Sequence, residues 1–161
     1  MGHVELRQLD DDDLDAVFEM MRDPDAVARA AFTAADPGDR PAFDEWMRHQ
    51  REDPAVNLFA VTEDGGFAGT AALFTVDGDR EVTYWIARHA WGRGVATRAL
   101  RQLIATEGER PLYARVASDN AASVTVLERV GFTELSRTTS FAPGVGREVE
   151  ERVYVLAPVL E

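Results

Sequence analysis

The segment from Tyr84 to Leu100, YWIARHAWGRGVATRAL, constrains the fold of this chain more than any other stretch. An apolar, β-like run ends in a glycine-containing turn, and the turn opens directly into a helix. Residues 91–96 therefore present several backbone N–H groups at a helix start, where a macrodipole of about half a charge favours phosphate oxygens. Gly92 and Gly94 let a ligand approach the bare backbone. The segment predicts a strand, a turn and a helix that can together hold an anion.

Two common phosphate-binding motifs do not account for this turn. It lacks the GK[ST] ending of a P-loop, and Thr97 occupies the third glycine position of the dinucleotide fingerprint GxGxxG. Two interpretations stay open at this point. The turn is either a tight strand-to-helix connection or the site of a pyrophosphate held mainly by backbone groups.

Length and composition favour one domain, residues 1–161, of a size that buries about 70% of its unfolded surface. No apolar run approaches the roughly 20 residues of a membrane span. The N-terminal residues lack the basic and apolar regions of a signal peptide, so we expect a cytoplasmic protein without a membrane partner. The absence of cysteine excludes disulfides, zinc–thiolate sites and a cysteine nucleophile, and we expect no metal site.

The net charge of −12 argues against a nucleic-acid partner, whose phosphates require a basic surface. A cationic partner fits this charge better. All 17 basic residues are arginine, a bias typical of a GC-rich genome. No lysine is therefore available as a Schiff-base or catalytic amine.

The order of periodic segments predicts an α+β fold with a mixed sheet and helices on both faces. Turns at 64–66 (DGG) and 77–79 (DGD) indicate hairpins, so the strands around them form an antiparallel meander. We expect strands at 4–9, 57–62, 67–76, 80–87, 112–117, 132–141 and 148–156, and helices at 14–21, 25–32, 42–51, 95–107 and 120–130. The run Asp10 to Asp13 is interpreted as the cap of a helix rather than as a metal site.

A second motif lies in SDNAASVTVLERVGF, residues 118–132. Asn120 and Ser123 are three residues apart and so share one face at a helix start. Taken by itself, the motif is also typical of simple helix capping, with Ser118, Asp119 or Asn120 as N-cap.

Taken in order along the chain, these segments resemble the GNAT superfamily of acyl-CoA-dependent N-acyltransferases. Within it they resemble the RimJ/RimL-type branch, which includes ribosomal-protein N-terminal acetyltransferases. The resemblance covers almost the whole chain and is carried by LRQLDDDDLDAVFEMMRDPD, TEDGGFAGTAAL, EVTYWIA, WGRGVAT, NAAS and LERVGF.

The resemblance implies a GNAT fold, with a mixed, mostly antiparallel sheet of six to seven strands. Its central parallel strands, 82–88 and 112–117, would splay apart and receive acetyl-CoA in the opening. By the same mapping, backbone groups of Ile86, Ala87 and Arg88 would bond the pantetheine amides, Arg93, Gly94, Val95, Ala96 and Thr97 would hold the pyrophosphate, and Asn120 and Ser123 would lie at the thiol end.

One departure from the family pattern concerns the acid that meets the leaving thiolate. Many GNAT enzymes place a tyrosine seven residues after the motif asparagine, and this chain has Leu127 there. The RimJ/RimL-type branch instead implies Ser123 as the catalytic hydroxyl. At a helix N-terminus such a hydroxyl can donate a hydrogen bond to developing negative charge without full proton transfer.

The implied reaction is direct attack of a neutral amine on the thioester carbonyl. At pH 7 an α-amino group is about one-tenth neutral, whereas a lysine-type amine is neutral about once in 2,500. Glu81 lies where the family often has an acid near the acceptor and is our candidate general base, acting through water. The alternative is that Glu81 is a solvated residue at the start of a strand. Phe32, Trp46 and Trp85 are expected to line the acceptor groove.

The acceptor is the part of the function on which the sequence leaves alternatives. A protein N-terminal α-amino group is favoured, and a small cationic amine such as an aminoglycoside-like antibiotic or a polyamine suits the net charge of −12 equally well. A third possibility, from a different class, is a module that binds acyl-CoA without catalysis. Homodimers are common in the branch that this chain resembles.

Overall fold

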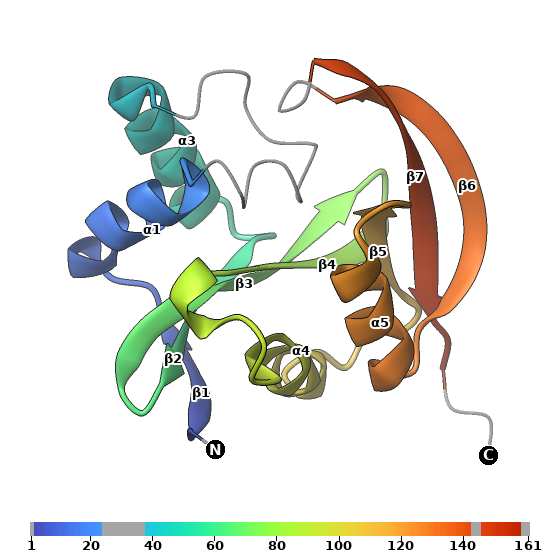
Figure 1. Ribbon diagram of the computed structural model, residues 1–161, viewed down its shortest axis with the longest axis horizontal. Helices are drawn as coiled ribbons and strands as arrows, with labels where there is room; N and C mark the ends of the chain where they lie inside the picture. Colours follow the sequence, from blue (N-terminus) through green and yellow to red (C-terminus); the bar gives the residue numbers. More distant parts are fainter. Residues whose placement is uncertain (1, 24–37, 143–145, 159–161) are drawn as a thin grey trace.

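The computed structural model describes residues 2–23, 38–142 and 146–158 (Figure 1). The helix expected at 25–32 lies outside these residues. The strands are β1 (Val4–Gln8), β2 (Asn57–Glu63), β3 (Gly66–Val76), β4 (Asp79–Ile86), β5 (Leu112–Ala117), β6 (Thr133–Ala142) and β7 (Arg147–Leu156). The helices are α1 (Leu14–Met21), α3 (Arg40–Glu52), α4 (Val95–Ala105) and α5 (Ala121–Val130), with 3-10 turns η1 (Asp11–Asp13) and η2 (Arg88–Ala90).

All seven strands form a single sheet in the order β1-β2-β3-β4-β5-β7-β6. The predicted antiparallel meander is confirmed, because β2 pairs with β3 and β3 pairs with β4 in antiparallel register. β5 pairs with β4 in parallel and with β7 in antiparallel register. The sheet is therefore mixed and mostly antiparallel, as expected.

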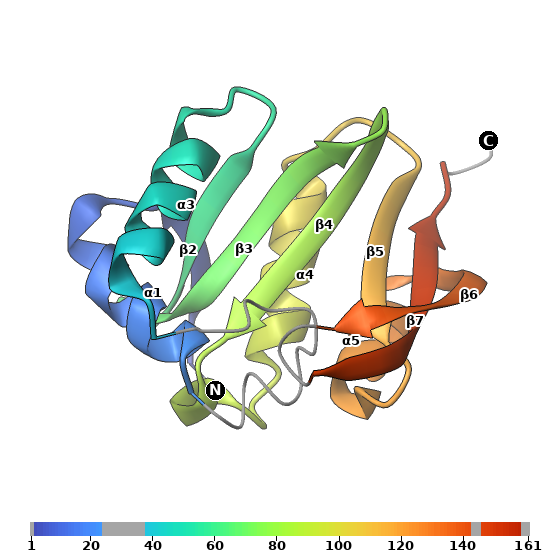
Figure 2. The ribbon, with the colours of Figure 1, turned by 90° about the horizontal axis from the view of Figure 1, so that it is seen from above.

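The parallel contact between β4 and β5 is short. Only Arg80 with Leu112 and Glu81 with Tyr113 are in register across it, whereas β4 stays paired with β3 up to Ile86. Figure 2 shows the two strands diverging from this point. The expected splayed pair of central strands is confirmed, and the divergence begins at Glu81.

Helices cover both faces of the sheet. α1 and α3 lie on one face, and α4 and α5 lie on the other (Figure 1). α4 turns Ala99, Leu100 and Leu103 toward the sheet, and each of these residues has 0% exposure. This spacing of three and four residues is that of an apolar stripe on one side of a helix. None of the helices in the described ranges is both long and apolar enough to cross a bilayer.

The acidic run before α1 is a helix start. The side chain of Asp10 accepts a hydrogen bond from the Asp12 N–H at 2.9 Å, and Asp13 binds the guanidinium of Arg7 through both carboxylate oxygens at 2.7 Å. Among the described residues, no group of three or more His, Asp or Glu side chains is placed to hold a metal ion. The capping interpretation of this run is confirmed.

The start of α3 differs from the prediction. The sequence predicts a loop through Pro41 and a helix from Ala42, but the helix begins at Arg40. The side chain of Asp39 accepts a hydrogen bond from the Ala42 N–H at 3.0 Å, so Asp39 is the N-cap. Proline fits the first turn of a helix because the N–H that it lacks would have no partner there.

Candidate active site

The divergence of β4 and β5 opens a cavity of about 570 Å³, called here the central cavity. Its wall comes from these two strands, with further residues from β3, β7, α4 and α5. Several residues singled out in the sequence lie on this wall: Glu81, Trp85, Ile86, Ala96, Asn120 and Ser123. The structure thus brings together residues from the two separate sequence motifs.

The N-terminus of α4 has the features of an anion site. Its N-cap is Gly94, in the left-handed conformation with φ +73°, and glycine has no side chain with which to cap the helix. The first turn contains no acidic residue. The first N–H groups of any α-helix have no intrahelical acceptor, so those of Val95, Ala96 and Thr97 need another partner. A Cβ built on Gly94 would meet nothing within 4 Å, so the approach to this backbone is open.

Arg93 supports the turn from outside. Its guanidinium pairs with Glu63 at the end of β2 and donates to the carbonyl of His89 at 3.0 Å. The hydrogen bond from Arg93 to Glu63 holds the pKa of the Glu63 carboxyl below its ordinary value. Arg98 in turn donates to the Arg93 carbonyl at 2.8 Å. The contacts of Arg93 and Arg98 therefore hold the turn before α4 against the end of β2 and the first turn of α4.

The predicted pantetheine partners, Ile86, Ala87 and Arg88, lie at the end of β4 and directly after it. The Ala87 N–H donates to the carbonyl of Ala68 at 2.8 Å, so this donor is used on the side toward β3. The Ile86 carbonyl accepts from the indole of Trp91 at 2.7 Å, and the Arg88 side chain pairs with Asp23 at 3.1 Å. Of these three residues, Ile86 lines the central cavity.

Asn120 and Ser123 meet at the first turn of α5. Asn120 is the N-cap, and its side-chain oxygen accepts a hydrogen bond from the Ser123 N–H at 3.2 Å. The Ser123 hydroxyl lies 2.6 Å from the phenolic oxygen of Tyr84 on β4. Burial raises the pKa of Tyr84 to about 12, although the hydrogen bond with Ser123 lowers it. Leu127, which occupies the family's tyrosine position, is 1% exposed and packs in the core.

Tyr84 was not foreseen as a site residue. It lies within the strand motif EVTYWIA, where a tyrosine is an ordinary strand residue. Its contact with Ser123 joins residues 39 positions apart on different elements. No signal in a single sequence links them.

Glu81 is buried, with 3% exposure, so the alternative of a solvated residue at a strand start is wrong. Burial raises the pKa of its carboxyl, and the nearby Arg115 guanidinium, with Nε at 3.3 Å, partly opposes this effect. Arg115 also reaches Glu151 at 3.4 Å. All three charged residues line the central cavity, which therefore holds a carboxyl more basic than usual.

The predicted acceptor-lining residues fall in three different places. Trp85 lines the central cavity. Trp46 lies on α3, is 46% exposed and does not belong to the described wall of that cavity. Phe32 lies outside the described residues.

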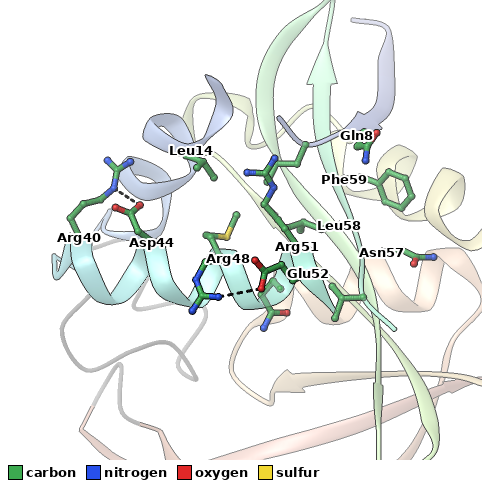
Figure 3. Close-up of a pocket in the computed structure, with 14 residues that line it drawn as sticks. Gln8, Leu14, Arg40, Asp44, Arg48, Arg51, Glu52, Asn57, Leu58 and Phe59 are labelled. Atoms are coloured by element: carbon green, nitrogen blue, oxygen red, sulfur yellow. Dashed lines mark hydrogen bonds and ion pairs between the residues drawn. The ribbon is translucent and has the colours of Figure 1, made fainter. Parts of the chain in front are cut away.

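A second cavity, of about 920 Å³, lies beside α3 and the strands β1 and β2 (Figure 3). Its arginines are paired with neighbouring carboxylates: Arg40 with Asp44 at 2.8 Å, Arg48 with Glu52 at 3.2 Å and Arg51 with Asp11 at 2.6 Å. The central cavity is the stronger candidate for a site, because residues of both sequence motifs, among them Ile86 and Ser123, lie on its wall.

Solved structures with the same fold cover nearly the whole chain. A spermidine N-acetyltransferase from Vibrio cholerae, in complex with CoA and spermine, matches with a TM-score of 0.83 and 20% identity over 96% of this chain and 95% of its own. A ribosomal-protein-alanine N-acetyltransferase from Brucella melitensis matches with a TM-score of 0.78 and 22% identity over 96% of this chain and 99% of its own. The chain thus has the same fold as these two proteins.

Sequence comparison identifies the family. Residues 3–133 match the acetyltransferase (GNAT) domain, and the chain belongs to this family. A Bacillus subtilis (strain 168) protein that carries the provisional name ribosomal N-acetyltransferase YdaF is 28% identical over 145 residues, 82% of this chain and 79% of that protein. The resemblance to RimJ/RimL-type acetyltransferases stated above is confirmed.

Proposed function

We propose that this protein transfers the acetyl group of acetyl-CoA to an amine, with the α-amino group of a protein N-terminus as the favoured acceptor. The observation that carries this proposal is that Ser123 and Glu81 line the same cavity. The Ser123 hydroxyl is suited to the leaving thiolate, and the Glu81 carboxyl is suited to the attacking amine. We place this activity in one acetyltransferase domain, residues 1–161, acting in the cytoplasm.

The donor side of the proposal is supported by the open start of α4 and by the facing edges of β4 and β5, which in the described part of the chain pair only at Arg80 with Leu112 and Glu81 with Tyr113. The pyrophosphate would bind the backbone of residues 93–97, since Gly94 leaves this backbone open. The pantetheine arm would lie between β4 and β5, where the strands have separated. The thiol end would lie near Asn120 and Ser123, on the wall of the same cavity. Several proteins of this fold were solved with CoA or acetyl-CoA, among them a microcin C7 self-immunity acetyltransferase.

The chemical step requires a neutral amine, a base and a group that accepts the charge of the leaving sulfur. The buried Glu81 carboxyl, whose pKa burial raises, takes the proton of the amine through water. Arg115 at 3.3 Å stabilises the carboxylate between turnovers. The Ser123 hydroxyl, at the N-terminus of α5, donates a hydrogen bond to the thiolate as the C–S bond breaks.

The favoured acceptor follows from the chemistry of amines and from relatives. An α-amino group near pKa 8 is deprotonated at a much smaller free-energy cost, by roughly 3 kcal/mol, than a lysine-type amine. The names of the Bacillus subtilis and Brucella melitensis proteins both refer to ribosomal N-acetylation. A second candidate acceptor is a small cationic amine, because the net charge is −12 and a spermidine acetyltransferase shares the fold.

An acceptor screen tests the proposal. Release of free CoA thiol is measured with acetyl-CoA and peptides with a free α-amino group, the same peptides with a blocked N-terminus, and spermidine. We expect turnover with free peptides and not with their blocked counterparts. Turnover with spermidine alone would favour the second acceptor class. Tight acetyl-CoA binding without thiol release from any amine would make the protein a binding module. The homodimer suggested by the resemblance is tested by its mass in solution.

A further inference from the structure

We propose that Tyr84 is a positioning residue for acetyl transfer: its phenol donates a hydrogen bond to the Ser123 hydroxyl and so directs the Ser123 proton toward the leaving sulfur. This inference rests on the proposed function and adds to it a residue that the sequence did not single out.

The geometry is that of a direct hydrogen bond between two elements. Tyr84 lies on β4 and Ser123 on the first turn of α5, and their oxygens are 2.6 Å apart. This distance lies at the short end of the range for O–H···O bonds. Both residues line the central cavity, so the hydroxyl pair faces the opening in which the strands separate.

The direction of the bond decides its effect. Each hydroxyl has one proton to donate, so either Tyr84 donates to Ser123 or the reverse. The pKa of Tyr84 is about 12. An alkyl hydroxyl resembles water and is a much weaker acid than a phenol, so the phenol is the stronger donor. With the phenol donating, the Ser123 proton remains available to a third group.

Without the phenol, the serine has a competing partner. A serine or threonine within a helix can donate to the carbonyl three or four residues earlier. For Ser123, the third residue of α5, the carbonyl at the helix start is that of the N-cap Asn120, three residues earlier. Thr125, half a turn further along α5, does this with the Ala121 carbonyl at 2.9 Å. The bond from Tyr84 fixes the Ser123 oxygen and also polarises its O–H, because linked hydrogen bonds strengthen one another.

The hydroxyl pair stabilises the thiolate without protonating it. A thiol has a pKa near 8.5, so transfer of the Tyr84 proton to the thiolate is unfavourable by about 3,000-fold. In the transfer step the amine nitrogen bonds to the carbonyl carbon, the C–S bond breaks, and its electron pair remains on sulfur. The amine proton leaves to Glu81 through water, and the thiolate accepts the Ser123 hydrogen bond. Charge and atoms balance without a further reactant.

The test compares Tyr84→Phe, Ser123→Ala and the double variant, with Tyr113→Phe as the matched control. Tyr113 is a partly buried strand tyrosine on β5 and does not belong to the described wall of the central cavity. We expect Tyr84→Phe to lower kcat about 10-fold and Ser123→Ala about 100-fold, with KM for acetyl-CoA within twofold of wild type. The double variant should match Ser123→Ala, because the phenol acts through the serine. Tyr113→Phe should keep the wild-type kcat.

Three results would overturn the proposal. They are a wild-type kcat for Tyr84→Phe, additive effects in the double variant, and a loss of affinity for acetyl-CoA, which has no thiolate, that parallels the loss of kcat. Thermal unfolding of each variant confirms that it is folded.

Free CoA gives a readout that needs no acceptor. If the pair donates to a thiolate, wild-type affinity for CoA rises as the pH passes the thiol pKa of about 8.5, and Tyr84→Phe loses this gain. Calorimetric titration at pH 7 and pH 9.5 measures the effect in both proteins. An identical pH dependence rejects the role of Tyr84 even if no amine is acetylated, whereas failure of the amine screen alone rejects only the proposed function.

Discussion

The two glycines of the turn before α4 allow a test that separates backbone strain from ligand binding. Gly92 and Gly94 both have positive φ, +82° and +73°. A Cβ built on either one meets nothing within 4 Å. Substitution by alanine therefore places the same strain on the same turn at both positions. Both glycines lie in the turn that the sequence assigns to an anion, but the family resemblance places the pyrophosphate on residues 93–97. That range includes Gly94, the N-cap of α4, and excludes Gly92.

The expected loss of stability is small and nearly equal for the two variants. Alanine in the left-handed region costs about 1–2 kcal/mol relative to glycine. The lower entropy of the unfolded chain returns about 0.4–1 kcal/mol. The net change is about 1 kcal/mol in the free energy of unfolding, or a Tm about 2–4 °C lower for a chain of this size. Thermal unfolding of Gly92→Ala and Gly94→Ala measures both values.

The two variants should differ in acetyl-CoA affinity. A methyl group on Gly94 would occupy the approach to the first N–H groups of α4, and loss of one charge-assisted hydrogen bond costs about 1.5–3 kcal/mol. We therefore expect Kd for acetyl-CoA to rise at least about 10-fold in Gly94→Ala and to stay within twofold in Gly92→Ala. Calorimetric titration gives both constants. Unchanged affinity in Gly94→Ala, or equal weakening in the two variants, would show that the turn is only a structural connection.

Three further substitutions test the site and its framework. Burial raises the pKa of Glu81, so kcat/KM of the wild type should fall at acidic pH as this carboxyl is protonated. Glu81→Gln should lose this acidic limb of the pH–rate profile and shift the profile to alkaline values. An unaltered profile would leave solvent as the base. Asp13→Asn should lower the free energy of unfolding at pH 7 by about 1–3 kcal/mol, since the hydrogen bond from Arg7 lowers the pKa of Asp13 in the folded protein. This stabilisation is full above the ordinary aspartate pKa and is lost as the pH falls through the lower folded-state value. Urea unfolding of both proteins at a series of pH values measures the effect. Gly69→Ala would place its Cβ 2.2 Å from the Trp85 carbonyl oxygen and should destabilise the protein by about 1–3 kcal/mol through displacement of β4; an unchanged Tm would contradict this close packing.

Local signals in the sequence predicted most of the elements. The DGG and DGD turns placed the strands on either side to within one residue at each end, because such turns depend on a few adjacent residues that tolerate positive φ. The bounds of β5 and the first residue of α4 agree with the prediction. Pro41 shows the limit of this approach, since the same residue type ends one helix and opens another depending on its position.

Contacts between elements that are distant in the sequence could not be predicted from local residue patterns. Burial of Glu81 depends on its place at the point where β4 and β5 part, and this splay was inferred from the family resemblance and not from periodicity. The 2.6 Å contact between Tyr84 and Ser123 depends on how α5 packs against the sheet. Helix and strand signals report local geometry, whereas these features arise from tertiary packing.

The short parallel contact between β4 and β5 gives one sheet four edges instead of two. Beyond Glu81 and Tyr113, each of these strands is paired with a neighbouring strand on one side and, within the described residues, has no strand partner on the other side, across the gap. Such an edge can recruit any extended chain, and proteins usually keep edges at the periphery of a sheet, where charge or a bulge can protect them. Here two edges lie in the middle of the molecule and face each other. A ligand that lies in the gap as an additional strand would pair with both inner edges and shield them from any other extended chain.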